Sequence, residues 1–536
     1  MGSSLLSGYE VLIVPRIACS LLSILCVDWS VWKMATMDTN NKSGDGVPIP
    51  VLLLASAWPM FCIISRPFSN SMESFLLACL MATTATTTAT TNQSKNKNDK
   101  VIRPYNFQFS IQVGAICAMG IFTRFTFVFF AAPVLLFLLH DMMHNNIYNS
   151  KWTAVVKPLC WMALSFGCVA MGIILTDTNF YSSLSTQIVA ETHNDTSPGG
   201  NDEDDPTVLS SFSSSWWKSF VVTPYNALAY NSQVSNLKDH GLHPRWTHAV
   251  VNMFILFGPL ALVAYISIIM RPWLQGPNTD NNHHHDRIRS VAQAIVVSGL
   301  AFLSAAPHQE PRFLLPLLTP LVLIVGRQTR KNPWLFSKYS SRPFLLLWIL
   351  FNGSLFIFFG WLHQAGVVQS LLAVGTLLAE RNPTTWIYWK TYMPPTFLTR
   401  MSHVVDVDST DTITTCQSNS RIVDLKGSSP KAIWDTLQTK LDCGENANRE
   451  NPDKIIHLVV PFLGKLKKDD NDDHDSIVLE GEDCYVFEDL YACNLVSSFG
   501  PHLTTEDVPP WDAGNSGLEF YQQRLVLNVY EIYCKD

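Results

Sequence analysis

The residues best suited to chemistry lie at 307–313, which read Pro-His-Gln-Glu-Pro-Arg-Phe between two apolar segments. Four kinds of polar group are concentrated there, those of His308, Gln309, Glu310 and Arg312. A guanidinium can contact two phosphate oxygens at once, and a carboxylate or imidazole can hydrogen-bond sugar hydroxyls. The segment therefore suits an anionic, hydroxyl-bearing ligand, although an ordinary loop with capping residues explains the spacing equally well.

A second polar cluster, residues 231–248, stands immediately before another apolar segment and reads NSQVSNLKDHGLHPRWTH. Its basic side chains crowd the entrance of that segment: His240, His243, Arg245 and His248. Three histidines beside an arginine suggest a metal, but the carboxylates and the ligand spacing of a zinc site are missing. We therefore expect no metal here, and residues that simply begin a helix remain the alternative.

A third cluster, residues 65–73, reads SRPFSNSME and offers Arg66, Asn70 and Glu73 as polar candidates. Helix capping by Asn70 or Ser71, with Glu73 in the first helical turn, is as good an explanation as ligand binding. Three more ionisable residues fall inside or beside apolar segments and need partners or water: Arg16, Asp28 and Arg124.

The composition indicates that a membrane positions these clusters. Of the 536 residues, 47% are hydrophobic and 15% charged, against about 25% charged in a soluble domain. Residues 1–383 carry a net charge of +5 and residues 384–536 one of −12, which predicts two regions in different environments. A soluble single domain, a coiled coil and a disordered chain are excluded, and no dense basic face supports nucleic-acid binding.

Ten apolar windows predict an all-α, multi-pass membrane bundle. They lie near 10–27, 50–65, 72–90, 107–122, 125–140, 153–175, 249–270, 290–306, 312–326 and 343–363. Lys and Arg gather in the loops around 95–103, 271–289 and 327–342, which the positive-inside rule assigns to the cytosol. Alternating crossings then make all three polar clusters and the acidic tail luminal.

Cysteines and histidines outside these clusters give no metal site. No CxxC occurs, and the tract His283–His285 is most simply a solvated loop. Five cysteines lie in the tail, at 416, 443, 484, 493 and 534, where an oxidising lumen favours one or two disulfides of unreadable pairing.

Several segments resemble one known family. SRPFSNSMES at 65–74, GIFTRFTFVFF at 120–130, residues 223–260 and HQEPRFLLPLLTPLVL at 308–323 are similar to the dolichol-phosphate-mannose-dependent mannosyltransferases of glycosyltransferase family 22. H-Q-E-x-R-F is the hallmark of that family, and the resemblance runs from about residue 8 to 400, including TYMPP at 391–395. Within the family, HG-x-HPR-x-TH is most similar to the subgroup that adds the fourth mannose to the glycosylphosphatidylinositol (GPI) precursor.

The resemblance implies a GT-C fold and an endoplasmic reticulum membrane enzyme with luminal catalytic loops. It implies inverting transfer of an α1,2-linked mannose from the lipid-linked donor to the GPI glycolipid, without cofactor or metal. Membrane lipid is then a further partner. The 308–312 residues become donor-binding candidates, those at 240–248 acceptor-binding candidates, and Arg66, Asn70 and Glu73 further candidates in a luminal turn.

In the family, the general base is an acidic residue between the first and second helices. This sequence begins with a segment that resembles the second helix, and alternation of the crossings makes residues 1–9 luminal. We therefore expect the first helix and the catalytic base to lie upstream of Met1, and no catalytic residue is identifiable. A miscounted crossing is the alternative explanation of a luminal N-terminus.

Other functions remain open. Another family member, adding the third GPI mannose or an N-glycan mannose, and a noncatalytic membrane glycosylation subunit are the main alternatives. A transporter is disfavoured because no inverted repeat is visible. In the tail, residues 455–462, 476–479 and 525–533 have the pattern of strands, which predicts a small α/β luminal appendage.

Overall fold

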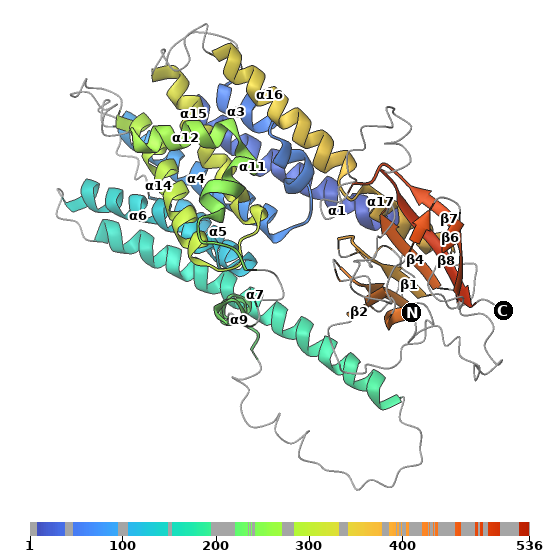
Figure 1. Cartoon of the computed structure of the whole chain (residues 1–536). Coiled ribbons are helices and arrows are strands. Elements are labelled where there is room, and N and C mark those ends of the chain that lie inside the picture. The colour runs from blue at the N-terminus through green and yellow to red at the C-terminus, as the bar shows by residue number, and fades with distance from the viewer. Residues whose placement is uncertain are drawn as a thin grey trace. The chain divides into compact units, whose positions relative to one another are not determined.

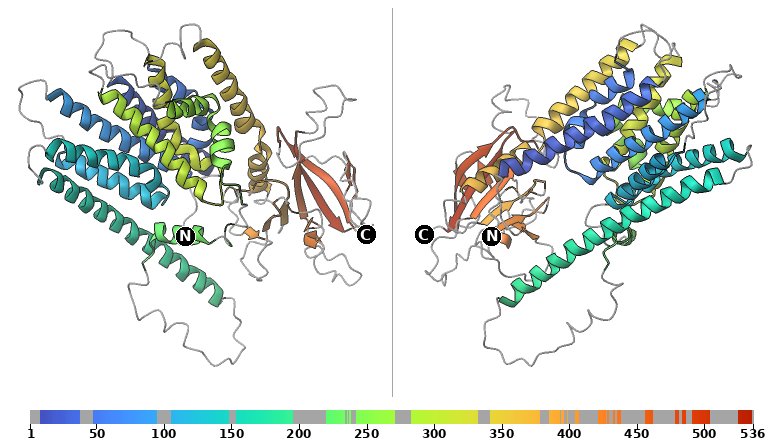
Figure 2. Two further views of the ribbon diagram at one scale, coloured as in Figure 1. Left: turned by 60° about the vertical axis from the view of Figure 1, so that its left-hand side comes forward. Right: turned by 180° about the vertical axis from the view of Figure 1, so that it is seen from behind.

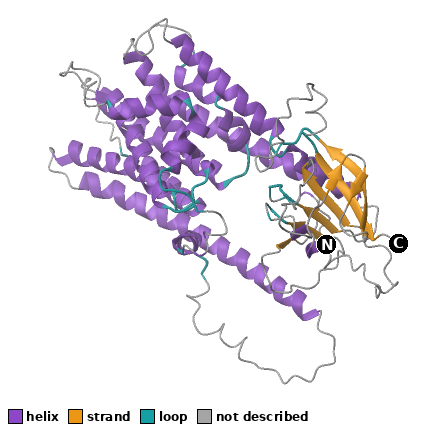
Figure 3. Ribbon diagram, in the orientation of Figure 1, coloured by secondary structure: helices purple, strands orange, loops and turns teal. Residues whose placement is uncertain are grey.

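The structure is a computed structural model that describes residues 8–37, 47–94, 105–147, 153–194, 220–233, 235, 237, 242–270, 283–331, 341–377, 385–392, 394, 395, 398, 404–406, 421–426, 428, 432, 433, 435–437, 456–461, 478–480, 483–485, 491–503 and 525–534. The chain forms two compact units. We call residues 16–354 the helical unit, and residues 1–15 with 355–536 the sheet unit. The strands belong to the second of these (Figure 3).

The helices follow one another along the chain as α1 (Gly8–Ser23), η1 (Ile24–Asp28), α2 (Trp29–Thr36), α3 (Ile49–Ala55), η2 (Met60–Ile64), α4 (Ser69–Ser94), α5 (Phe107–Thr123), α6 (Phe127–Ile147), α7 (Thr153–Asn194), α9 (Thr223–Ser232), η5 (His248–Asn252), α11 (Met253–Phe257), α12 (Pro259–Ile269), α14 (His283–Ala305), η6 (Pro311–Leu317), α15 (Leu318–Lys331), α16 (Ser341–Ile357), η7 (Phe358–Leu362) and α17 (Ala365–Leu377) (Figure 1). The elements labelled η are π-helical turns, except η6, which is a 3-10 helix. The tract His283–His285, expected in a loop, begins α14.

All ten apolar windows are helical, which confirms the predicted multi-pass bundle. Among the described residues, five helices are long and apolar enough to cross a membrane: Tyr9–Thr36, Phe127–His144, Thr153–Ser182, Arg287–Ala305 and Pro343–Leu362. The remaining windows are shorter, interrupted or less apolar. The window at 249–270, for example, breaks at Gly258, whose φ of 44° suits glycine, and a Cβ there would lie 2.6 Å from the ring of Phe351.

The longest helix, α7, packs along α5 and extends beyond its neighbours (Figure 2). The two helices approach closely because Gly114 faces the backbone of α7, and a Cβ there would lie 2.2 Å from the carbonyl oxygen of Met162. Ser165 also donates a hydrogen bond of 2.8 Å to the carbonyl oxygen of Ile111. Small residues at helix contacts are typical of membrane bundles.

The sheet unit contains one mixed eight-stranded sheet, in the order β2-β3-β1-β4-β8-β7-β6-β5. Its strands are β1 (Thr385–Tyr388), β2 (Val404–Asp406), β3 (Arg421–Asp424), β4 (Ile456–Pro461), β5 (Val478–Glu480), β6 (Asp483–Tyr485), β7 (Tyr491–Phe499) and β8 (Leu527–Cys534). Strands β2, β3, β1 and β4 are parallel, and the rest are antiparallel. Three of these strands, β4, β5 and β8, confirm the strands predicted in the tail. The register places Cys484 opposite Cys493.

Both faces of the sheet are covered. Trp386 and Tyr388 of β1 pack on one face with Leu371 of α17, whereas the alternate residues Ile387 and Trp389 pack on the other. Successive strand residues point to opposite faces, so a strand buried on both sides reads as a continuous apolar run. The small α/β appendage expected from the sequence is therefore present.

Candidate functional site

The polar turn at 307–313 follows α14, which ends at Ala305, and continues into the first residues of η6. Prolines at 307, 311 and 316 prevent an α-helix from continuing through it. Glu310, which precedes a proline, is extended with φ −92° and ψ 142°, as that position favours. The Nε2 atom of His308 lies 3.0 Å from Oε1 of Glu310, and Arg312 forms an ion pair with the other carboxylate oxygen. The turn is thus a connected set of charged groups.

Glu310 remains ionised in this setting. Burial raises its pKa, but the guanidinium of Arg312 and hydrogen bonds from Arg312 and His308 outweigh burial and hold the pKa below its ordinary value. The side chains of Glu310 and Arg312 are 29% and 45% exposed, so a ligand can reach both. A carboxylate with a lowered pKa accepts hydrogen bonds from hydroxyls but is a weak general base.

Gln309 is placed differently from its neighbours, because it is only 1% exposed. Its Oε1 accepts a hydrogen bond of 2.8 Å from the backbone N–H of His248. Its Nε2 donates to the carbonyl oxygens of Ser304 and Ala306, at 3.2 and 3.1 Å, and to that of Arg245 at 3.4 Å. The amide is therefore fully used in joining the turn to the second cluster.

The second cluster packs directly against the turn. The backbone N–H of His243 donates to the carbonyl oxygen of Pro307 at 2.9 Å, and the guanidinium of Arg245 donates to that of Ala305. The imidazoles of His243 and His308 lie 6.0 Å apart. Both His243 and Arg245 are exposed, so their side chains can also meet a ligand.

His248 behaves as a core residue of the same site. It is fully buried, and its Nδ1 lies 3.0 Å from the amide nitrogen of Asn252, which also donates to the Gln309 carbonyl oxygen at 3.4 Å. Its Nε2 has no hydrogen-bond partner among the described residues. The fourth predicted member of this cluster, His240, lies outside the described residues.

The third cluster reaches the turn through Arg124. Glu73 is fully buried, with Oε2 3.5 Å from Nε of Arg124 and Oε1 accepting a 2.8 Å hydrogen bond from Thr126. The Arg124 guanidinium lies over the Phe313 ring, 4.9 Å from its centre. The Arg312 guanidinium lies 5.7 Å from the centre of the Phe68 ring. All three clusters therefore meet at one end of the helical unit.

Asn70 and Arg66 are less directly engaged. Asn70 lies inside α4, which begins at Ser69, so it is not an N-cap. It is 2% exposed, and its amide nitrogen has no hydrogen-bond partner among the described residues. Arg66 is half-buried in the turn before α4.

Arg124, Thr126 and Asn252 are site residues that were not among the candidates named from the sequence, although all three lie in segments that resemble the family. Arg124 was noted only as an arginine between two apolar windows that needs a partner. Thr126 and Asn252 gave no signal of their own, because single hydroxyl and amide groups at helix ends are common.

The described residues contain no group of three His, Cys, Asp or Glu side chains that could hold a metal ion. The groups that do converge are guanidiniums, one accessible carboxylate and imidazoles. Such a set can bind a phosphate and the hydroxyls of a sugar.

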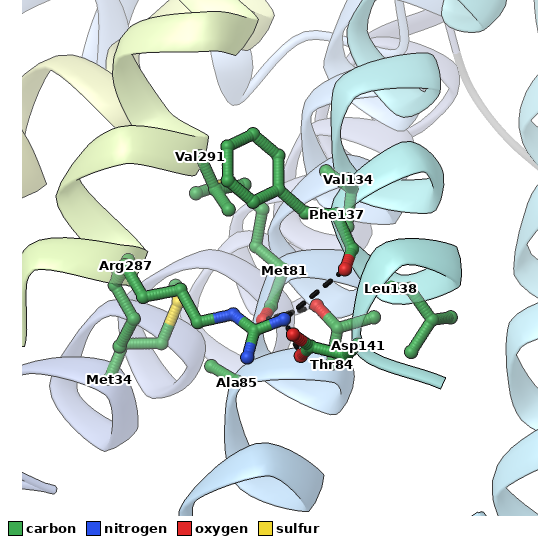
Figure 4. Close-up of a pocket in the computed structure, with 11 residues that line it drawn as sticks. Met34, Met81, Thr84, Ala85, Val134, Phe137, Leu138, Asp141, Arg287 and Val291 are labelled. Atoms are coloured by element: carbon green, nitrogen blue, oxygen red, sulfur yellow. Dashed lines mark hydrogen bonds and ion pairs between the residues drawn. The ribbon is translucent and has the colours of Figure 1, made fainter. Parts of the chain in front are cut away.

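A pocket elsewhere in the helical unit is chemically different (Figure 4). Its polar pair is Asp141 of α6 and Arg287 of α14, which form an ion pair, and Arg287 also donates to the carbonyl oxygen of Phe137 at 3.2 Å. The cavity measures about 30 Å³, which is room for about two water molecules. Along α14, Arg287 is on the order of 25 Å from Ser304, so this pocket is separate from the polar site.

Residues 3–399 match the model of the Alg9-like mannosyltransferase family. The chain belongs to this family. All three polar clusters lie within the matched residues, whereas strands β2 to β8 lie beyond them.

Several curated relatives carry the name GPI mannosyltransferase 4. The one from Saccharomyces cerevisiae is 29% identical over 72% of this chain and 62% of its own length. The one from Emericella nidulans is 30% identical over 72% of this chain and 59% of its own length. The one from Drosophila melanogaster is 27% identical over 72% of this chain and 57% of its own length. The chain thus spans about three-fifths of the length of these relatives, and no solved structure matches it.

Proposed function

We propose that this multi-pass membrane protein is a mannosyltransferase of GPI-anchor biosynthesis in the endoplasmic reticulum. It transfers mannose from dolichol-phosphate-mannose to the third mannose of the GPI precursor and so adds the fourth. The observation that carries the proposal is the convergence of the three polar clusters within the residues that match the family. The names of the relatives support the GPI pathway and the position of the added mannose.

The geometry suits the donor at the 307–313 turn. Arg312 would contact the phosphate, while Glu310 and His308 would hydrogen-bond the mannose hydroxyls. As the bond between mannose C1 and the phosphate oxygen breaks, its electron pair stays on dolichyl phosphate, which gains negative charge. A fixed guanidinium stabilises this developing charge, which lowers the barrier to transfer.

The acceptor would meet the donor at the segment that contains His243 and Arg245. The attacking hydroxyl oxygen of the GPI mannose forms the new bond to C1, and its proton passes to a general base. The lowered pKa of Glu310 argues against giving it that role, so no described residue is assigned as the base.

A transfer assay tests the proposal. Microsomes from cells that lack their own fourth-mannose transferase would receive this protein, radiolabelled dolichol-phosphate-mannose and a GPI acceptor with three mannoses. We expect a four-mannose product that α1,2-mannosidase shortens. Transfer only to a two-mannose acceptor would instead assign the third mannose. Transfer to neither acceptor by an inserted protein that also carries the predicted upstream base would contradict an enzymatic role and favour a noncatalytic subunit.

A further inference from the structure

Arg124 occupies the tight turn that joins α5 to α6. α5 ends at Thr123, and Arg124 follows in an extended conformation with φ −156°. The turn is tight because Gly120 allows the Phe127 ring to approach; a Cβ at residue 120 would lie 2.3 Å from that ring. The tight turn therefore fixes the position of the Arg124 Cα atom.

The Arg124 guanidinium is held from one side by α4 and by Thr126. Nε lies 3.5 Å from the buried carboxylate of Glu73 and donates a 3.3 Å hydrogen bond to Thr126 Oγ1. Nη1 donates a 3.2 Å hydrogen bond to Ser69 Oγ. A guanidinium has five N–H donors, so these two hydrogen bonds leave others available. The side chain is 21% exposed, whereas that of Glu73 is 1% exposed.

The charged groups around Phe313 differ in their access to solvent: Glu73 is buried, whereas Glu310 and Arg312 are partly exposed. Glu73 cannot reach a ligand, because it is buried behind Arg124. Glu310 lies with Arg312, and Arg124 lies over the Phe313 ring beside them. Burial lowers the pKa of Arg124, Glu73 raises it, Arg312 lowers it and Glu310 raises it. The Arg124 guanidinium is therefore near both members of the Glu310–Arg312 ion pair, and the two guanidiniums repel each other. The Glu310 carboxylate offsets part of that repulsion, and a ligand anion that contacts both guanidiniums would offset the rest.

We infer that Arg124 and Arg312 together bind the phosphate of the lipid-linked donor, and that Glu73 is the positioning residue that holds Arg124. This inference rests on the proposed function, and it adds a second guanidinium to the donor site. The donor phosphodiester carries one negative charge, and the dolichyl phosphate that leaves carries up to two. A pair of guanidiniums therefore suits the leaving group better than a single one.

The test is equilibrium binding of radiolabelled dolichyl phosphate to the full chain solubilised from microsomes, which requires no transfer. Removing one member of a buried ion pair destabilises a protein, because the other charge is left uncompensated. The decisive variant is therefore the double substitution Arg124→Gln with Glu73→Gln, which removes both charges. Thermal unfolding of each variant is measured alongside binding.

We expect the double variant to regain the thermal stability that either single variant loses, and yet to bind dolichyl phosphate about tenfold or more weakly than wild type. Glu73→Asp, which keeps the charge, should bind more tightly than Glu73→Gln. The matched control removes the ion pair of the separate pocket, Arg287→Gln with Asp141→Asn, and should leave binding unchanged.

A double variant that binds dolichyl phosphate as wild type does would show that the pair is only structural and would overturn the inference. If the double variant binds as wild type does but Arg312→Ala abolishes binding, the proposed donor site stands and only the inference about Arg124 fails. If wild type does not bind dolichyl phosphate, the proposed donor fails and the inference fails with it.

Discussion

The side-chain oxygen of Gln309 accepts a 2.8 Å hydrogen bond from the backbone N–H of His248, although 61 positions separate the two residues in the chain. Both are buried. This bond joins the turn proposed to bind the donor to the segment proposed to bind the acceptor. If the two segments bind the two substrates as proposed, this bond sets the spacing between them.

Gln309→Ala is expected to reduce transfer far more than its effect on folding would explain. The substitution leaves the His248 N–H buried without a partner, which costs about 1–3 kcal/mol of stability, and it releases the 242–248 segment. The matched control is Gln293→Ala, because Gln293 is 4% exposed and its amide donates to Ser267 at 3.2 and 3.3 Å. Both variants should lose similar stability in thermal unfolding. Equal losses of transfer in the two would contradict this role.

Removing the Glu310 charge should affect stability in a pH-dependent way. Its pKa is lowered in the folded protein, with Arg312, His308 and Arg124 as the charged or titratable groups around it. Its contribution is therefore fully present above the unfolded value of about 4.3 and is lost as the pH falls through the lower folded value.

The measurement compares the thermal unfolding of wild type and Glu310→Gln from pH 5 downward. The difference in unfolding temperature should shrink as the pH falls below about 4. Asp435→Asn, which changes an exposed carboxyl, is the control. A difference that grows as the pH falls would show that the pKa of Glu310 is raised instead.

Replacing His243 and Arg245 together by alanine should impair the acceptor step alone. Both side chains are exposed beside the turn. Polar contacts that become buried when a hydroxyl-rich ligand binds discriminate strongly between ligands. Transfer to a three-mannose GPI acceptor should fall by about tenfold or more, with donor binding nearly unchanged. Leu242→Ala, at an exposed neighbouring residue, is the control. Loss of donor binding would contradict this assignment and indicate that the two residues serve only the structure of the segment before η5.

The sheet unit is predicted to lie in the lumen. Lys426→Asn creates the glycosylation acceptor Asn-Gly-Ser at an exposed turn, where the φ of 50° suits asparagine. We expect a glycosidase-sensitive increase in mass in microsomes. The increase is measured against wild type, because the sequence already contains the acceptors Asn41-Lys42-Ser43, Asn92-Gln93-Ser94, Asn194-Asp195-Thr196 and Asn352-Gly353-Ser354. Of these, Asn92, at the end of a helix predicted to face the cytosol, should stay unmodified. Modification at Asn92 but not at residue 426 would reverse the orientation.

The bundle and part of the sheet could be predicted from the sequence because their signals are local. Apolar windows identify helices, and alternation identifies strands such as β4 and β8. The short strands β1, β2, β3 and β6 were not predicted, because three or four residues rarely show a period, although the equally short β5 was predicted. The nine-residue β7 was also not predicted. The break at Gly258 depends on the Phe351 ring, which no local pattern reports.

The site could be predicted only in pieces. Density of polar groups at helix ends identified the three clusters, but their convergence depends on long-range packing. Gln309 was expected to bind the donor. In the structure its side-chain amide accepts a hydrogen bond from the backbone of His248 and donates one to the backbone of Ser304. Arg124 lies in a segment that resembles the family, but its role could not be predicted, because that role depends on Glu73 on another helix.

The central claim is that the converged clusters form the donor site, and photocrosslinking tests it most directly. A dolichyl phosphate analogue with a photoreactive group on the isoprene unit nearest the phosphate would be irradiated with the protein, and the labelled peptides would be mapped. We predict label in residues 65–74, 120–130 and 307–313, reduced by excess dolichol-phosphate-mannose. Competed label around Asp141 and Arg287 instead, with none at the turn, would contradict the account.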